Sequence, residues 1–234
     1  MHALAATLDA LMLRARLAKR RLSGVDGGLM GHYMRGTICR KLHIGCGLHL
    51  LPGWLNADFL PSSSSVMHLD ATQPFPFADD QFAFAFSEHM IEHVDFRDGQ
   101  RMLAEVYRVL RPGGVVRIAT PDLAFLVELG DPHCSSSHRR YVEWATKTLL
   151  PAAPFADASF VVNHFMRSWG HRFIYSDRTL RHALAEAGFD RIARLELCVS
   201  EHSELCKLEN EDRMPEGFLK LETMVFEGTK ESGA

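Results

Sequence analysis

The sequence has no run of 18 apolar residues and no regular cysteine pattern, and both absences narrow the class of protein. The longest apolar-rich stretch, residues 149–162, is interrupted by two prolines and an aspartate, so we expect no membrane-spanning helix. Its five cysteines are scattered without a Cys-x-x-Cys pair, which argues against a disulfide framework and a thiolate zinc site. The N-terminal apolar residues precede the basic ones, unlike a secretory signal, so we expect a cytoplasmic protein.

The sequence also has no excess of basic residues. The 234-residue chain carries 26 Lys and Arg against 29 Asp and Glu, so its bulk charge gives no reason to expect binding to nucleic acid. Hydrophobic residues make up 47% and charged residues 24%, values typical of a folded globular domain. A chain of this length buries enough apolar surface to fold without disulfides or metals.

The first residues of the chain are predicted to form a helix. Residues 2–22 have leucines at helical spacing and end in basic residues, which suit a helix C-terminus packed on the main domain. Contact with a membrane surface or a protein partner through residues 2–22 stays open. The four glycines between Ser23 and Gly31 predict a hinge. We therefore divide the chain into an N-terminal helix and hinge, residues 1–31, and a main domain, residues 32–234.

The main domain alternates between short apolar runs, turns and amphipathic helices, which predicts an α/β fold with a parallel sheet and helices on both faces. The predicted strands cover residues 41–44, 54–57, 66–69, 82–86, 115–119, 189–199 and 219–227. Helices are predicted over residues 98–110 and from Ser176 or Asp177 onward. Residues 124–170 contain several prolines and serines and are predicted to be an irregular insertion with short helices.

Glycines or polar residues follow four consecutive predicted strands. These are Gly45-Cys46-Gly47, Asp58, Asp70 and Ser87-Glu88-His89. Ligands of doubly wound sheets bind beyond the carboxyl ends of the strands, so we expect these residues to meet at one site. Glycines let the backbone approach a ligand, and carboxylates accept hydrogen bonds from ribose hydroxyls or from an exocyclic amine. The pattern therefore suits a nucleoside, although a strand-end aspartate can also simply cap the next turn.

Two common nucleotide motifs are absent from this region. Gly47 is followed by Leu48-His49-Leu50, so the third glycine of a G-x-G-x-x-G dinucleotide fingerprint is missing. No G-x-x-x-x-G-K-[ST] phosphate loop occurs anywhere in the chain. Both absences argue against NAD(P) and nucleoside triphosphates as ligands.

Together the motifs resemble class I S-adenosylmethionine-dependent methyltransferases, and within them the small bacterial type 11 group. The resemblance rests on LHIGCG at 42–47, PGWLNAD at 52–58, DA and PFPF within 70–77, FSEHMIEH at 86–93 and EVYRVLRPGG at 105–114. It covers residues 40–123 well and 171–228 loosely. It implies a Rossmann-like fold with a seven-stranded, mostly parallel sheet, an antiparallel last strand and S-adenosylmethionine as cofactor.

The resemblance also implies roles for individual residues. The expected cofactor contacts are Gly45, Cys46, Gly47, Asp58, Asp70, Ala71, Ser87 and Glu88. In such a site the glycine loop lies against the methionine part of the cofactor. The first aspartate binds the ribose hydroxyls, and the second accepts from the adenine amine. The sequence departs from the family pattern at His43, where many members carry an acid, and at the missing third glycine.

Four histidines are candidates for the chemistry of methyl transfer. Transfer to a hydroxyl requires alignment of the acceptor with the sulfonium and removal of a proton. Histidine exchanges a proton near neutral pH, so His89 and His93 are the candidate catalytic residues. His164, His171 and Arg172 lie where the family places a substrate-covering segment and are the candidate acceptor contacts. A purely structural role is the competing interpretation for each histidine.

A second motif overlaps this region. Residues 89–93, His-Met-Ile-Glu-His, match the H-x-x-E-H signature of inverted zinc proteases. That chemistry needs both histidines on one helical face and a further ligand, whereas here the motif directly follows a predicted strand. We assign no metal site from the sequence, and a divalent ion held by Glu88, Glu92 or His93 stays open.

We therefore predict an enzyme that methylates an oxygen of a small molecule or saccharide, with residues 124–170 as a lid. Nitrogen and carbon acceptors are not excluded. One rival is a non-catalytic S-adenosylmethionine-binding or interaction module that uses the N-terminal helix as a partner surface. The other is a metal-dependent hydrolase built on His89, Glu92 and His93. A homodimer stays open, and no nucleic-acid partner is expected.

Overall fold

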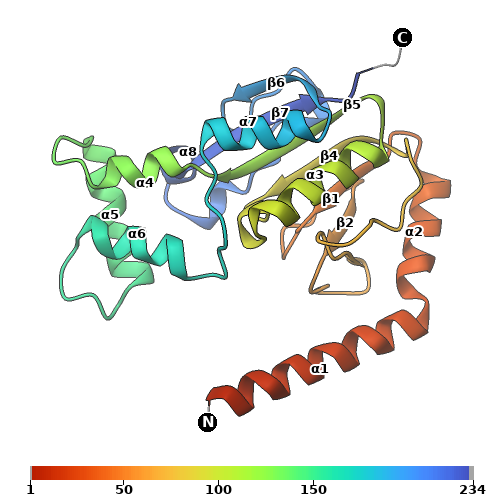
Figure 1. Cartoon of the computed structure of the whole chain (residues 1–234), viewed down its shortest axis with the longest axis horizontal. Coiled ribbons are helices and arrows are strands. Elements are labelled where there is room, and N and C mark those ends of the chain that lie inside the picture. Colours follow the sequence, from red (N-terminus) through yellow and green to blue (C-terminus); the bar gives the residue numbers. More distant parts are fainter. Residues whose placement is uncertain (1, 232–234) are drawn as a thin grey trace.

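The computed structural model describes residues 2–231 and contains one seven-stranded sheet (Figure 1). The strands are β1 (Lys41–Ile44), β2 (Leu55–Asp58), β3 (Met67–His68), β4 (Phe82–Glu88), β5 (Leu110–Pro121), β6 (Asp190–Leu195) and β7 (Thr223–Thr229). Their order is β3-β2-β1-β4-β5-β7-β6, and β7 runs antiparallel to both of its neighbours. The remaining pairs are parallel, which confirms the predicted α/β fold with its antiparallel last strand.

Helices and short 3-10 turns connect these strands. The α-helices are α1 (His2–Ser23), α2 (Val25–Gly36), α3 (Phe96–Val109), α4 (Leu123–Leu129), α5 (Ser136–Leu149), α6 (Ala158–Arg167), α7 (Asp177–Glu186) and α8 (Phe218–Glu222). The 3-10 turns are η1 (Ile91–His93), η2 (Ser203–Leu205) and η3 (Glu211–Arg213). No helix within residues 2–231 combines the length and the apolar character needed to cross a bilayer.

The main core lies between the sheet and the pair α3 and α7 (Figure 1). The apolar stripe of α3 consists of Met102, Leu103, Val106 and Val109. All four side chains are buried, and each such burial stabilises the fold by roughly 1.5–3 kcal/mol. On the opposite face, a smaller apolar cluster packs Phe86 against Leu205 of η2.

The junction of β4 and α3 carries two of the candidate site residues. η1 follows directly on β4 and holds Glu92 and His93 in a single tight turn. The side chain of Asp95 then accepts a hydrogen bond from the Asp98 amide at 3.0 Å, which caps α3. A fixed helix start immediately after the turn holds both side chains in place.

The glycine-rich segment between Ser23 and Gly31, predicted as a hinge, is mostly helical. Helix α1 matches the predicted helix, and α2 begins only two residues after it ends. Gly24 alone breaks the helix, with φ of 66°, a conformation that glycine adopts without steric cost. Glycines inside a helix cost roughly 1 kcal/mol each, and packing of Met30 and Tyr33 against the core offsets this.

The C-terminal end of α1 packs on the main domain. Arg16 donates to the Pro61 carbonyl at 2.9 Å, and Arg20 donates to the Val66 carbonyl and pairs with Asp26. These contacts agree with the expected packing of the basic helix end. The side chains of residues 2–10, 13 and 14, which carry part of the leucine stripe, lie outside the described part of the chain.

The predicted insertion at residues 124–170 is more regular than expected. It contains helices α4, α5 and α6, and the 14-residue α5 is as long as α3. The three helices enclose their own apolar cluster around Phe125, Tyr141 and Phe165. In Figure 1 they stand as a separate group beside the sheet.

The two ends of this insertion meet at the sheet. The Leu123 amide donates to the Tyr175 carbonyl at 2.9 Å, and the Asp122 amide donates to the Glu222 carbonyl at 2.8 Å. The insertion therefore leaves and rejoins the sheet at a single place. The strand predicted from Leu219 begins later, at Thr223, because residues 218–222 form the short helix α8.

Candidate active site

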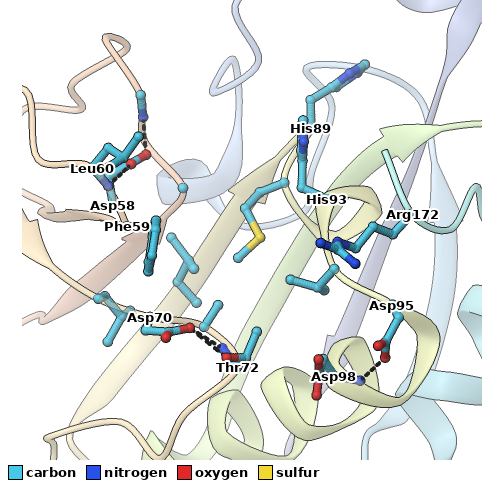
Figure 2. Close-up of a pocket in the computed structure, with 17 residues that line it drawn as sticks. Asp58, Phe59, Leu60, Asp70, Thr72, His89, His93, Asp95, Asp98 and Arg172 are labelled. Atoms are coloured by element: carbon cyan, nitrogen blue, oxygen red, sulfur yellow. Dashed lines mark hydrogen bonds between the residues drawn. The ribbon is translucent and has the colours of Figure 1, made fainter. Parts of the chain in front are cut away.

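A cavity of about 750 Å³ lies at the carboxyl ends of the first strands (Figure 2). The sequence-predicted residues that line it are Gly45, Gly47, Asp58, Asp70, Ala71, His89, His93 and Arg172. Its volume is within the range of small-molecule and cofactor sites. Figure 2 shows Asp58 and Asp70 on one side, and His89, His93 and Arg172 on the other.

The glycine loop after β1 is shaped by close packing. Gly45 has φ of 72°, and a Cβ built on it would lie 2.3 Å from Cγ of Met90. Its amide and that of Cys46 donate to the Ala57 carbonyl at 2.8 and 3.1 Å, which fixes the loop to β2. A Cβ on Gly47 would meet no atom within 4 Å, so its backbone borders open space. The loop thus leaves its main chain accessible from the cavity.

Both strand-end aspartates cap turns and also face the cavity (Figure 2). Asp58 accepts hydrogen bonds from the Gly47 amide at 2.9 Å and the Leu60 amide at 2.7 Å. Asp70 accepts from the amide and hydroxyl of Thr72 at 3.0 and 2.7 Å. A carboxylate has about four acceptor positions, so these contacts leave capacity for ligand hydroxyls or an amine. The capping and binding interpretations are therefore compatible.

Three predicted cofactor contacts, Cys46, Ser87 and Glu88, do not line this cavity. Cys46 and Ser87 are buried, and burial together with Asp58 raises the pKa of the Cys46 thiol to about 12. Side chains alternate along a strand, so Glu88 faces the same side of the sheet as Phe86. Its carboxylate accepts from the Asn210 amide at 3.1 Å, away from the glycine loop.

A second cavity of about 560 Å³ adjoins the first and shares His89 and His93 with it. Aromatic side chains from the insertion form much of its wall: Tyr141, Trp144, Phe165 and Trp169. The polar residues that line it beside the two shared histidines are Glu92, Thr148, His171, Arg213 and Glu222. This cavity therefore joins flat apolar surfaces to a small number of polar groups, as binding sites for small organic molecules commonly do.

His89 stands between the two cavities. Its φ of 45° is unusual for a residue with a side chain, and such strain occurs most often at functional positions. Its Nε2 lies 2.8 Å from the Thr223 hydroxyl and 3.9 Å from Glu222, and its Nδ1 lies 3.5 Å from Glu92. Burial, with Arg213 nearby, holds its pKa well below the usual value, so the ring is neutral at pH 7.

Two buried carboxyl groups flank this histidine. Burial raises the pKa of Glu92 to about 8, although Thr120 donates to its Oε2 at 3.0 Å. Burial also raises the pKa of Glu222 to about 7, against the opposing effects of a hydrogen bond from the Tyr141 hydroxyl and the nearby Arg213. Carboxyl groups that titrate near neutral pH within a cavity are candidates for proton transfer.

One of the two histidines predicted to contact the acceptor lines the second cavity. His171 lines the cavity and donates from Nδ1 to the Phe165 carbonyl at 2.7 Å. His164 lines neither cavity and packs edge-on against Trp169, with ring centroids 4.2 Å apart. Consecutive residues of a helix point about 100° apart, so the inward position of Phe165 turns His164 away.

The H-x-x-E-H motif does not adopt the arrangement of a zinc protease. His89 follows the last residue of β4 and has a positive φ, and His93 lies in the 3-10 turn η1. The two histidines therefore do not occupy one face of an α-helix, which that chemistry requires.

Sequence reasoning missed several residues of the second cavity, namely Tyr141, Trp144, Arg213 and Glu222. The spacing of Tyr141 and Trp144 on one side of an amphipathic helix was the one usable signal. Glu222 lies in α8, within a segment predicted as strand, so its position could not be inferred.

Comparison with known proteins shows which fold the chain shares. Residues 46–118 match the family model described as a methyltransferase domain. The solved S-adenosylmethionine-dependent methyltransferase from Mesorhizobium loti is 16% identical with a TM-score of 0.51, and the match covers 88% of this chain and 100% of that one. A SAM-dependent methyltransferase from Archaeoglobus fulgidus is 16% identical with a TM-score of 0.50, covering 92% and 94%. These two structures show that the fold is shared.

A further similar structure belongs to a protein that is longer than this chain. Phosphoethanolamine N-methyltransferase 2 from Haemonchus contortus, in complex with S-adenosyl-L-methionine, is 15% identical with a TM-score of 0.44 over 83% of this chain. This chain spans 49% of the length of that protein. No curated protein matches the chain by sequence.

Proposed function

The chain carries a class I S-adenosylmethionine-dependent methyltransferase domain, and from this premise we propose that it transfers the cofactor's methyl group to an oxygen of a small molecule or saccharide. The supporting observation is the pair of adjoining cavities that share His89 and His93. One cavity presents strand-end carboxylates suited to a nucleoside, and the other presents aromatic walls with buried acid and base groups. The reacting atoms would meet at their common wall.

The larger cavity is the proposed site of S-adenosylmethionine. Asp58 would accept hydrogen bonds from the ribose hydroxyls, and Asp70 would accept one from the adenine amine. The backbone of Gly45 and Gly47, which lines this cavity, would lie against the methionine part. A cofactor held in this way would present its methyl group to the wall formed by His89 and His93.

The smaller cavity is the proposed acceptor site. Its aromatic walls offer flat surfaces on which a sugar ring or another compact ring can pack. His171, Arg213 and Glu222 supply donors and acceptors that would orient hydroxyl groups. We assign residues 32–234 to the methyltransferase domain and residues 124–170 to a lid that determines which acceptor fits.

Of the two candidate bases, we propose His89 because it lies between two carboxyl groups. The acceptor oxygen would form a bond to the methyl carbon as the sulfur–methyl bond breaks, releasing S-adenosylhomocysteine. The hydroxyl proton would pass to the neutral imidazole of His89. The ionised form of Glu222, whose pKa is about 7, would stabilise the imidazolium that results.

Calorimetric titration with S-adenosylmethionine and S-adenosylhomocysteine tests the cofactor site. Asp58→Asn removes a charged acceptor, and hydrogen bonds to charged groups contribute roughly 1.5–3 kcal/mol, so we expect about 10- to 100-fold weaker binding. The matched control Asp190→Asn changes an exposed aspartate outside both cavities and should bind within two-fold of the unmodified chain. Absence of binding to the unmodified chain would refute the proposal.

Transfer is tested with radiolabelled S-adenosylmethionine and a panel of monosaccharides, glycosides and phenols. We expect label in at least one hydroxylated acceptor and a lower transfer rate in His89→Gln. Cofactor binding without transfer to any member of the panel would contradict O-methylation and favour the non-catalytic binding module. Label found only on amines or carbon would replace oxygen as the acceptor atom.

A further inference from the structure

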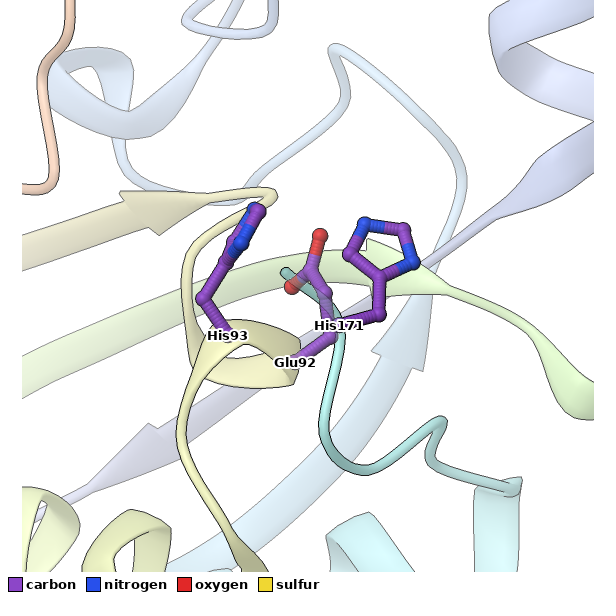
Figure 3. A group of neighbouring side chains, drawn as sticks. All are labelled: Glu92, His93 and His171. Carbon is purple, nitrogen blue, oxygen red and sulfur yellow. The ribbon is translucent and has the colours of Figure 1, made fainter. Parts of the chain in front are cut away.

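Two segments distant in the sequence bring three metal-ligand side chains together at the junction of the two cavities (Figure 3). Glu92 and His93 come from η1, and His171 comes from the loop after α6. One ligand atom of each lies within 4.8 Å of the others. Ligand atoms around one ion lie about 3–4 Å apart, so small side-chain rotations bring these three to bonding distance. We propose that Glu92, His93 and His171 bind one divalent transition-metal ion.

Hydrogen bonds hold each of the two segments in place. The amides of Arg172 and Phe173 donate to the Glu92 carbonyl at 2.7 and 3.2 Å, which joins the two segments through the main chain. His171 donates from Nδ1 to the Phe165 carbonyl at 2.7 Å, and this tautomer leaves Nε2 free to bind a cation. Such supporting hydrogen bonds are typical of histidines that bind metals.

Glu92 provides the strongest indication that a cation binds here. Its side chain is fully buried, and Thr120 donates to Oε2 at 3.0 Å while buried Oε1 has no hydrogen-bond partner. Within residues 2–231 no lysine or arginine pairs with it. Buried carboxylates are costly unless they are paired or coordinate a metal. Figure 3 shows this carboxylate between the two imidazole rings, where an ion would satisfy it.

The donor set indicates which ions the site would take. Two imidazoles and one carboxylate suit Zn²⁺, Fe²⁺, Co²⁺ or Mn²⁺, whereas Mg²⁺ and Ca²⁺ prefer sites made of oxygen alone. Three protein ligands leave at least one coordination position open. Since His93 borders both cavities, an acceptor oxygen could occupy that position and its hydroxyl would lose a proton more easily. Metal binding stands independently of the proposed function, whereas this role for the ion depends on it.

Metal binding is tested by titrating Zn²⁺ into the chelator-treated full chain by calorimetry and by recording the visible absorption of its Co²⁺ form. We expect one tight site per chain. Glu92→Gln and His171→Gln each remove a ligand and should weaken Zn²⁺ binding at least 10-fold and change the Co²⁺ spectrum. The matched control His182→Gln removes an exposed histidine of α7 and should leave both unchanged.

Titration of each variant with S-adenosylmethionine separates a local effect from misfolding. Unchanged cofactor affinity in Glu92→Gln, which retains the bond from Thr120, shows that the fold is intact even if His171→Gln fails to fold. No saturable site for Zn²⁺ or Co²⁺, or a site that persists in both variants, would overturn the inference. Metal binding without cofactor binding would refute the proposed function alone, and the reverse result would refute the metal site alone.

Discussion

The two cavities are built in different ways, although they share a wall. The polar groups of the cofactor cavity come mostly from residues 45–98, and Asp58 and Asp70 accept hydrogen bonds from nearby main-chain amides. The smaller cavity, proposed to bind the acceptor, is assembled from residues 89–93, 141–171 and 213–222. Its carboxyl groups are buried, and their pKa values are raised toward neutrality.

The two kinds of carboxyl group suit different tasks, namely binding a ligand in a fixed position and exchanging a proton. A carboxylate held by backbone amides keeps its charge and position, which suits a cofactor that is the same in every turnover. A buried carboxyl group that titrates near neutral pH can change its charge at small cost, which suits proton transfer or metal binding. The comparison can be tested by substituting residues of each cavity and measuring cofactor affinity and the pH dependence of stability.

The largest effect is expected from Gly45→Ala in the cofactor cavity. The added methyl group would lie 2.3 Å from Cγ of Met90 at a φ of 72°, so the loop or Met90 must move. We expect S-adenosylmethionine affinity to fall at least 100-fold, measured by calorimetry. Gly53→Ala has similar backbone strain, with φ of 76° and nothing within 4 Å of the new atom, and should keep its affinity. Equal affinities in the two variants would show that the packing of the loop does not matter for binding.

An intermediate effect is expected from Glu222→Gln in the acceptor cavity. The pKa of Glu222 is raised from 4.5 to about 7, so the folded state favours the protonated form. Its contribution to stability is therefore complete below pH 4.5 and is lost as the pH rises through 7, a change of about 3 kcal/mol. We therefore expect the free energy of unfolding to fall less between pH 5 and 8 in the glutamine variant than in the unmodified chain. Urea unfolding of the chelator-treated proteins measures this difference.

The control for that measurement is Glu201→Gln, which changes an exposed glutamate. It should reproduce the pH dependence of the unmodified chain. If the free energy of unfolding of Glu222→Gln falls with pH as steeply as that of the unmodified chain, the proton on Glu222 does not contribute to stability. The contrast between the two cavities in the titration of their carboxyl groups would then weaken.

The smallest effect is expected from Cys46→Ala. Cys46 lies in the glycine loop but lines neither cavity, so S-adenosylmethionine affinity should stay within two-fold by calorimetry. Its raised pKa, about 12, also predicts slow alkylation by iodoacetamide at pH 7.5. A loss of affinity as large as that of Asp58→Asn would support the cofactor contact expected for Cys46 from the sequence.

Elements specified by local signals could be predicted closely. Strand β1 has the predicted bounds, and α7 begins after Ser176, whose side chain and that of Thr179 form a capping box. The helical course of residues 25–36 and the late start of β7 could not be predicted. Both depend on packing against distant residues, which outweighs glycine content and β-branched composition.

The same distinction applies to the candidate site. Asp58, Asp70 and the glycines could be placed because parallel strands deliver their carboxyl ends to one edge of the sheet. Ser87 and Glu88 are buried and do not line that cavity, so their predicted contact with the cofactor stays a prediction. Glu222 and Tyr141 could not be placed at all, since only the folded insertion brings them together.

The clamp that joins the two ends of the insertion has an evolutionary consequence. Hydrogen bonds of Leu123 to Tyr175 and of Asp122 to Glu222 close the insertion at its base, so its interior can vary without moving the sheet. A whole helical cassette could be exchanged between relatives at this point, as loops are exchanged on other conserved scaffolds. New acceptor preferences can then arise by recombination at two neighbouring positions, while the strand ends that line the larger cavity keep their place.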